Sequence, residues 1–209
     1  MKPGVWPDPA GAPADFAGGT DALVRIELPV AREWLATLRA GDEAILTGPV
    51  FTARDATHAK LLDALEREGE LPHGLGGATL FYAGPTPEAA GRPVGAVGPT
   101  TAKRMDAATP ALLRAGIVAT IGKGARSEAV REACIETGSV YFAAVGGAAA
   151  LLATHVRRVT EVAWPELGTE ALVRLDLVDF PVFVAIDAHG GDLYADAPAA
   201  FRAHEAELS

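Results

Sequence analysis

The sequence predicts a mixed α/β fold. Through the first two thirds of the chain, short apolar runs typical of strands alternate with runs of helical spacing, which indicates parallel strand pairing. The last third holds further strand-like runs with only Gly168 and Phe180-Pro181 between them, which indicates an antiparallel part. The chain has 209 residues, 49% of them hydrophobic, so it is long enough to bury a substantial core.

The elements follow in order along the chain. Residues 1–22 are rich in Pro, Gly and Ala without apolar periodicity, so we expect a flexible leader and then a single domain over residues 23–209. Residues 23–28 alternate as a strand does, and residues 30–38 have helical spacing. The further strand-like runs are 44–47, 78–82, 94–97, 117–121, 140–145, 159–164, 171–179 and 182–187. The further helix-like runs are 56–66, 108–115, 127–137 and 148–156.

Composition excludes several classes of partner. The formal net charge of −9 argues against broad binding to nucleic acid or to anionic membrane, so we expect small-molecule or protein partners. No stretch resembles a signal peptide or reaches the roughly 18 apolar residues of a membrane helix, which predicts a cytoplasmic protein outside the membrane. Cys134 is the only cysteine, so the chain has no intramolecular disulfide and no cysteine cluster for zinc or iron and sulfur.

Positive charge is concentrated in residues 100–131, which contain six basic residues and only two acidic ones. In an acidic protein this favours a small anionic ligand for the segment. Solvated helix charges are the alternative and would explain about half of the six, because Arg114, Arg126 and Arg131 fall in helix-like stretches.

Polar side chains follow the strand-like run 44–47, where Gly48 predicts a strand end that leads into a helix. Arg54 has no evident structural task and is a candidate for binding an anion. Either Asp55 or Thr57 can cap the helix, and the alternative role of Asp55 is a ligand contact at the positive end of the helix dipole. His58 falls one turn inside that helix, where a buried, hydrogen-bonded histidine and a proton-transfer role are both open.

Two further glycine turns carry hydroxyl groups and cations. In Gly98-Pro99-Thr100-Thr101, two hydroxyls stand at an expected helix start, with Arg104 one turn later on the face of Thr100. Lys123 lies between two glycines directly after an apolar strand, where backbone and ligand can approach closely. The structural alternatives are a Pro-Thr helix cap with an exposed arginine, and a tight turn with an exposed lysine.

Two more glycine stretches have simpler explanations. Gly146-Gly147 lies between a strand and a helix without a nucleotide-binding motif, and close packing of that helix is the favoured role. Asp187 to Asp192 offers oxygen and nitrogen ligands for a metal, but a glycine hairpin between strands is favoured.

Several of these motifs resemble those of the class I fumarate hydratase and L-tartrate dehydratase family, the iron–sulfur hydro-lyases, in its β subunit or C-terminal domain. The resemblance spans about residues 26–196. It is carried by Ala53-Arg54-Asp55 with His58, by Gly98-Pro99-Thr100-Thr101 with Arg104-Met105-Asp106, and by Gly122-Lys123-Gly124, together with Phe81-Tyr82-Ala83-Gly84-Pro85, Glu166-Leu167-Gly168, Glu170-Ala171 and Asp179-Phe180-Pro181.

The resemblance implies a swivelling β/β/α three-layer domain with mixed parallel and antiparallel sheets. It also implies a [4Fe-4S] cluster held by three cysteines of a partner α subunit or another domain, not by this chain, and an α2β2 assembly. Thr100 matches the catalytic acid/base, and the substrate-carboxylate contacts match Arg54, Arg104 and Lys123. Asp55, His58 and Thr101 match motif positions without an assigned role.

The resulting hypothesis is the β subunit of a hydro-lyase that acts on a small dicarboxylate. Fumarate and malate are the first choice of substrate pair, and L-tartrate is the second. The opposing hypothesis is an anion-binding module of the same fold without catalysis. Retention of Thr100 beside Arg104 and Lys123 argues against it, because binding alone does not need the hydroxyl.

Overall fold

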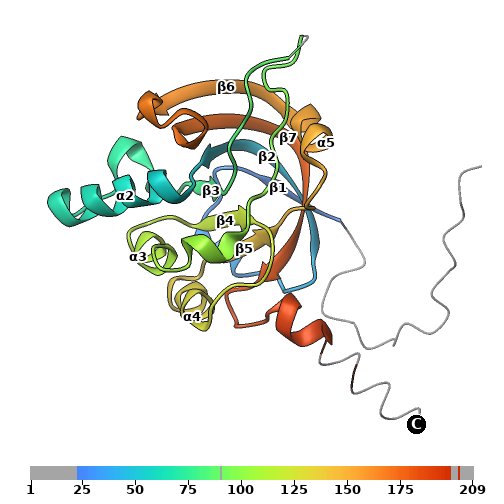
Figure 1. Cartoon of the computed structure of the whole chain (residues 1–209). Coiled ribbons are helices and arrows are strands. Elements are labelled where there is room, and N and C mark those ends of the chain that lie inside the picture. The colour runs from blue at the N-terminus through green and yellow to red at the C-terminus, as the bar shows by residue number, and fades with distance from the viewer. Residues whose placement is uncertain (1–22, 90, 199–201, 203–209) are drawn as a thin grey trace, which may run out of the picture.

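The computed structural model describes residues 23–89, 91–198 and 202, and in this part of the chain seven strands form one sheet in the order β1-β2-β3-β4-β5-β7-β6 (Figure 1). The strands are β1 Val24–Glu27, β2 Glu43–Thr52, β3 Thr79–Phe81, β4 Ala119–Gly122, β5 Val140–Ala143, β6 Val156–Ala163 and β7 Leu172–Ile186. The α-helices are α1 Arg32–Leu35, α2 Asp55–Glu68, α3 Thr109–Arg114, α4 Glu128–Thr137 and α5 Ala149–Leu152. The 3-10 helices are η1 Pro72–Gly74, η2 Ala102–Met105, η3 Ala153–His155 and η4 Pro165–Glu170.

The pairing confirms the predicted mixed α/β class. Strands β1 to β5 pair in parallel with their neighbours, whereas β7 is antiparallel to β2, β5 and β6. Because β7 pairs with β2 as well as with β5, the strands β2, β3, β4, β5 and β7 close into a ring. The three-layer division and the swivelling motion stay predictions, as does the single domain over residues 23–209; the expected leader, residues 1–22, lies outside the described residues.

Strand β7 corrects the prediction of two strands separated by Phe180-Pro181. It runs without interruption over 15 residues, and Pro181 lies within it, opposite Ile45 of β2. Next to the expected break, Asp179 has a φ of 51°, and the register of β7 against β2 shifts nearby, between Leu46 and Gly48 of β2. A proline in a strand only removes one backbone donor, and the long pairing with β2 tolerates that loss.

Strand β2 corrects the prediction that Gly48 ends a strand. The strand continues for four residues beyond Gly48 to Thr52, and its register against β7 shifts between Leu46 and Gly48. Gly48 has a φ of 121°, and a Cβ there would lie 2.4 Å from the carbonyl oxygen of Leu28. Glycine is therefore needed for a β-bulge that brings β2 close to the chain after β1.

The expected strand over residues 94–97 is wrong. These residues form the return arm of a projecting loop between β3 and η2 (Figure 1), tied to the outgoing arm by bonds such as Thr86 N to Ala96 O at 2.9 Å. Prolines at 85, 87 and 93 remove backbone donors from both arms, which prevents a regular ladder.

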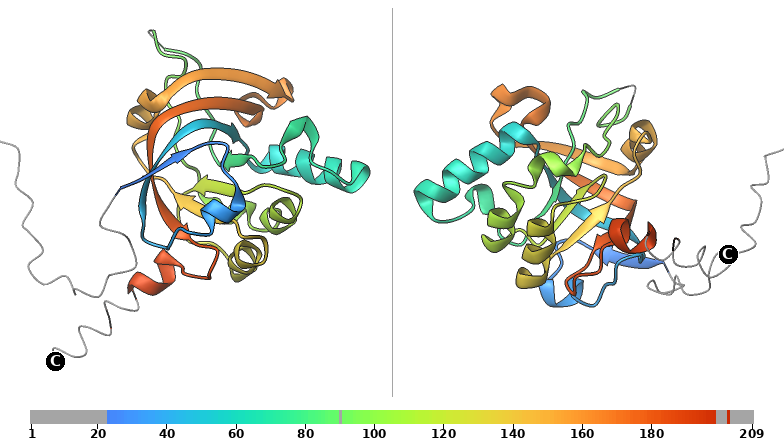
Figure 2. Two further views of the ribbon diagram at one scale, coloured as in Figure 1. Left: turned by 180° about the vertical axis from the view of Figure 1, so that it is seen from behind. Right: turned by 60° about the horizontal axis from the view of Figure 1, so that its bottom comes forward.

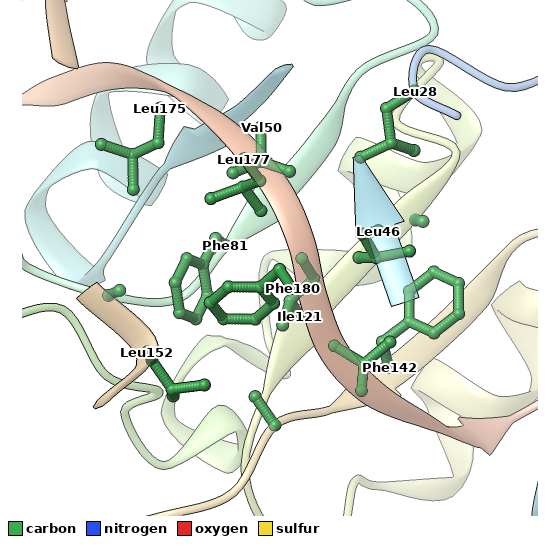
Figure 3. Close-up of a cluster of buried hydrophobic side chains, with 14 of the residues drawn as sticks. Leu28, Leu46, Val50, Phe81, Ile121, Phe142, Leu152, Leu175, Leu177 and Phe180 are labelled. Atoms are coloured by element: carbon green, nitrogen blue, oxygen red, sulfur yellow. The ribbon is translucent and has the colours of Figure 1, made fainter. Parts of the chain in front are cut away.

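Two apolar cores lie on opposite faces of the same strands. The first fills the ring and contains side chains from all five of its strands, including Phe81 and Phe180, whose rings meet edge to face at 5.4 Å (Figure 3). The second contains Leu80 and Tyr82, the neighbours of Phe81 in sequence, because successive side chains of a strand alternate between faces. Helices α2, α3 and α4 cover this second core (Figures 1 and 2).

Candidate active site

Backbone hydrogen bonds bring the second and third glycine turns together. Thr100 N donates to the carbonyl of Tyr82 at 2.7 Å, and Lys123 N donates to the carbonyl of Thr100 at 3.2 Å. Ala102 N then donates to the carbonyl of Lys123 at 3.0 Å, so Thr101 and Lys123 form a short parallel bridge. The segment that carries both hydroxyls therefore lies beside Lys123, which directly follows β4.

Arg104 reaches the hydroxyl that the sequence placed one turn before it. Thr101 precedes the 3-10 helix η2, so Thr100 lies in extended chain, and Arg104 reaches back to it from within the helix. Arg104 Nη2 donates to Thr100 Oγ1 at 2.9 Å and lies 3.1 Å from Asp55 Oδ2. This contact joins the first and second predicted turns.

Arg54 is enclosed more tightly than Arg104. Its Nη2 lies 3.2 Å from Glu170 Oε1, and about a quarter of each side chain is exposed. Its Nε is buried without a hydrogen-bond partner in the described structure. At Gly84 a Cβ would lie 3.0 Å from Arg54 Nη1 and 2.8 Å from the carbonyl of Thr169, so a side chain there would push the guanidinium aside.

The start of α2 corrects the capping alternative for Asp55 and Thr57. The N-cap position is Arg54, and the carboxylate that accepts the Ala56 N–H, at 2.8 Å, belongs to Glu170. Thr57 donates its hydroxyl to the backbone carbonyl of Glu170. Sequence reasoning missed Glu170 as a site residue, because 114 positions separate it from Ala56 and only the motif Glu170-Ala171 pointed to it.

His58 is a buried, hydrogen-bonded histidine, which is one of the two roles that the sequence left open. It is 3% exposed, its ring lies edge to face with Tyr82 at 5.1 Å, and its Nδ1 lies 2.8 Å from the carbonyl of Arg54. Since a carbonyl only accepts, Nδ1 carries the proton and donates it. Burial lowers the pKa of His58 from 6.5 to about 4, against the opposing effect of the Arg54 carbonyl, so the ring is neutral at pH 7. A proton-transfer role for His58 stays a prediction.

This pKa gives a testable dependence of stability on pH. Between pH 6.5 and pH 4 the unfolded chain protonates His58 and the folded chain does not, so the free energy of unfolding should fall as pH falls through this window, by about 3 kcal/mol in all. We expect His58→Asn to remove this part of the pH dependence in urea titrations from pH 7 to pH 4. The exposed His189 supplies the control, and a His189→Asn variant that lost the same dependence would contradict the assignment.

The cationic segment divides as the sequence suggested, with one difference. Arg114 pairs with Glu136 at 2.7 Å and Arg131 with Glu128 at 2.5 Å, both on the surface. Arg126 is not a solvated helix charge: its side chain has no exposed area and pairs with Asp106. Arg126 lies just before α4, and Asp106 also accepts the backbone N–H of the next residue, Ser127.

Lys123 differs from both site arginines. In the part of the chain that the structure describes, its ammonium group has no carboxylate partner, whereas Arg54 and Arg104 each have one. Its side chain lies over Gly146, where a Cβ would be 3.2 Å from Lys123 Cδ, and it borders a pocket of about 250 Å³ with Phe183 and Tyr194. A larger pocket of about 650 Å³, between the projecting loop and β6, contains none of the predicted site residues.

The described residues do not fit an iron–sulfur cluster or another metal centre. They contain no group of three or more His, Cys, Asp and Glu side chains that could hold a metal ion. Cys134 is buried in α4, and burial raises the pKa of its thiol to about 12, so it is not an available thiolate ligand. Asp187 instead accepts backbone N–H groups of Ala40, His189 and Gly191. The segment is a glycine turn closed by a single antiparallel bridge between Ile186 and Asp192, and helical residues follow it, so the predicted hairpin between two strands is wrong.

Comparison with known proteins places this geometry in a family. The family model described as Fumarase C-terminus matches residues 5–197, which include every predicted site residue. The chain belongs to this fumarase C-terminus family. Among the residues that the structure describes, none of the helices has the length and apolar character of a membrane-spanning segment.

Similar proteins include fumarate hydratases and a tartrate dehydratase subunit. The chain is 36% identical over 180 residues to fumarate hydratase 2 of Leishmania major and 40% identical over 151 residues to the anaerobic class I fumarate hydratase of Escherichia coli strain K12. These matches cover 84% and 71% of this chain, but only 32% and 28% of the two relatives. The chain therefore spans about a third of their length. It is also 34% identical over 173 residues to the L(+)-tartrate dehydratase subunit beta of E. coli strain K12, covering 80% of this chain and 85% of that subunit.

Proposed function

We propose that this chain forms the substrate-holding and proton-transferring half of a hydro-lyase active site for a small dicarboxylate. The observation that carries the proposal is the bond from Arg104 Nη2 to Thr100 Oγ1, formed where backbone bonds fix Lys123 beside Thr100. A hydroxyl held by a guanidinium, with a lysine on the adjoining segment, is suited to proton transfer, whereas anion binding alone needs only the cations.

The chemistry assigns one task to each group. In the dehydration direction, the alkoxide of Thr100 takes the proton from the carbon beside a carboxylate, the electron pair of that C–H bond forms the new double bond, and the neighbouring carbon loses its hydroxyl group as hydroxide. Return of the proton from Thr100 Oγ1 to this hydroxide gives the water that is released and restores the alkoxide. A threonine hydroxyl is a weak base in water, so the alkoxide form needs the positive charge of Arg104 and Lys123. Arg54 and Lys123 hold the substrate carboxylates, and Arg104 combines both tasks.

A [4Fe-4S] cluster would be supplied by a partner α subunit or another domain in this proposal, with α2β2 as the expected assembly. The sequence has one cysteine, which is buried, so this chain does not provide the ligand set. The tartrate dehydratase relative is itself a subunit beta, which supports a separate partner chain.

Fumarate and malate are the proposed substrate pair, supported by the fumarate hydratases among the similar proteins. L-tartrate is the second candidate, and the similarity over 85% of a tartrate dehydratase β subunit favours it. Both are 2-hydroxy dicarboxylates or their dehydration products, so the same cations serve either.

The test is an anaerobic purification of the tagged chain together with the proposed α subunit, expressed from the neighbouring gene. Assays with fumarate, malate and L-tartrate follow. We expect turnover of one of these, and a roughly 10- to 100-fold lower kcat/KM for Arg104→Lys, because a lysine replaces two donors of a planar fork by a point charge. Arg114→Lys is the matched control, since Arg114 pairs with Glu136 on the surface. Binding without turnover would favour the non-catalytic module, and equal effects of the two variants would place Arg104 outside the site.

A further inference from the structure

Asp55 has a contact that neither helix capping nor substrate binding explains. Its Oδ2 lies 3.1 Å from Arg104 Nη2, the nitrogen that donates to Thr100 Oγ1 at 2.9 Å. This nitrogen carries two hydrogens, and each of the two contacts can use one of them. Asp55 and Thr100 together therefore fix the orientation of the Arg104 guanidinium.

We propose that Asp55 is a positioning residue that holds Arg104 on the Thr100 hydroxyl, an inference that rests on the proposed function. Asp55 acts through Arg104 and needs no contact with the substrate. Its task is to keep Arg104 Nη2, which donates to Thr100 Oγ1, in place while the Thr100 hydroxyl exchanges its proton.

The local structure leaves the Asp55 carboxylate available for this task. Asp55 is the first residue of α2, but Glu170 already accepts the Ala56 N–H that a capping side chain would take. Glu170 also pairs with the Arg54 guanidinium, so the side chain before Asp55 and the backbone N–H after it are both tied to the last residue of η4. Asp55 thus projects from a fixed helix start toward a side chain on another element.

The exposure of the pair explains why Arg104 needs a second anchor. The Arg104 side chain is 46% exposed and that of Asp55 is 45% exposed. A half-exposed arginine held by a neutral hydroxyl alone samples several rotamers. Misplacement of a reacting group by about 1 Å can cost about 100-fold in rate. Arg54 and Lys123 hold their places without Asp55, so substrate affinity should suffer less than turnover.

The first test compares two identical substitutions in the same helix. In the assembled enzyme we expect Asp55→Asn to lower kcat about 10- to 100-fold while KM changes less than about threefold. Asp63→Asn is the matched control, because Asp63 pairs with Arg67 on the exposed part of α2. Asp55→Glu, which retains the charge, should recover most of the lost kcat. Equal kcat values for Asp55→Asn and Asp63→Asn would overturn the proposal.

The second test asks whether Asp55 acts through Arg104. In an Arg104→Lys background, Asp55→Asn should lower kcat by less than about twofold further, because the group that it positions is gone. An undiminished effect in that background would show that Asp55 acts by another route and would overturn the proposal.

A third readout needs no turnover. Two bonds to one guanidinium nitrogen slow rotation about the Cζ–Nη2 bond of Arg104, which arginine side-chain NMR of the full chain measures. We expect faster rotation in Asp55→Asn and an unchanged rate in Asp63→Asn. The absence of a difference would overturn the positioning role, whereas normal NMR behaviour in an enzyme that turns over none of the dicarboxylates would count against the proposed function alone.

Discussion

Replacing Thr100 with valine should lower kcat by about 100- to 10,000-fold in the assembled enzyme, because the substitution removes the group proposed to transfer the proton and keeps its shape. Thr100 accepts a bond from Arg104 Nη2 and is half-buried, with its backbone fixed by Tyr82 and Lys123. The backbone bonds do not involve the hydroxyl, so the variant should fold. The measurement is kcat in both directions, together with exchange of solvent protons into the product.

Thr101→Val is the control for this experiment. Thr101 is the next residue and exposed, and the described structure shows no hydrogen bond of its side chain to Arg104. Its loss should be much milder than that of Thr100. Near wild-type kcat for Thr100→Val, or a larger loss for Thr101→Val, would move the acid/base to His58 or to the partner.

Replacing Arg126 with methionine should destabilise the fold by about 3 to 5 kcal/mol, because it leaves a buried carboxylate without its counter-ion. The Arg126 side chain has no exposed area, and its Nε lies 2.6 Å from Asp106 Oδ1. Its guanidinium also lies 5.2 Å from the ring centre of Tyr82 and 4.8 Å from that of Tyr141. Although burial lowers the pKa of Arg126, Tyr82 and Asp106 hold it above its ordinary value, so the group stays charged.

Urea titrations of the chain would measure this loss as the change in the free energy of unfolding. Arg114→Met supplies the comparison and should cost much less, since the pair of Arg114 with Glu136 is exposed to solvent. The double variant Arg126→Met with Asp106→Asn should regain part of the stability, because no buried charge is then left unpaired. Equal losses for Arg126→Met and Arg114→Met would show that the buried pair has no special weight.

The buried pair also explains how the two parts of the site keep their spacing. Asp106 directly follows η2, which carries Arg104, and it accepts the backbone N–H of Ser127 at 2.6 Å. Tyr141 donates its hydroxyl to the carbonyl of Gly124, next to Lys123. The buried contacts around Arg126 therefore connect the segment that carries Thr100 and Arg104 to the segment that carries Lys123.

Local patterns were sufficient for the fold class and for the segments that carry the site. Alternation and helical spacing placed β1, β4, β5, α2 and α4 within a few residues, because each buries one face against its neighbours. The spacing of Thr100 and Arg104 placed them on one face, and the structure brings the two side chains into contact there. The same reasoning failed at Gly48 and Pro181, where pairing between β2 and β7 outweighs the local tendency of glycine and proline to end strands.

Contacts between distant segments were decided by the tertiary structure alone. Sequence determined that Arg54, Asp55, Thr100, Arg104 and Lys123 stand beside turns, and hence near the ends of strands. It did not determine that Asp55 faces Arg104, that Glu170 caps α2, or that Arg126 is buried on Asp106. Charged side chains leave no periodic signal, and their pairing depends on where the closed ring of strands places each turn in space.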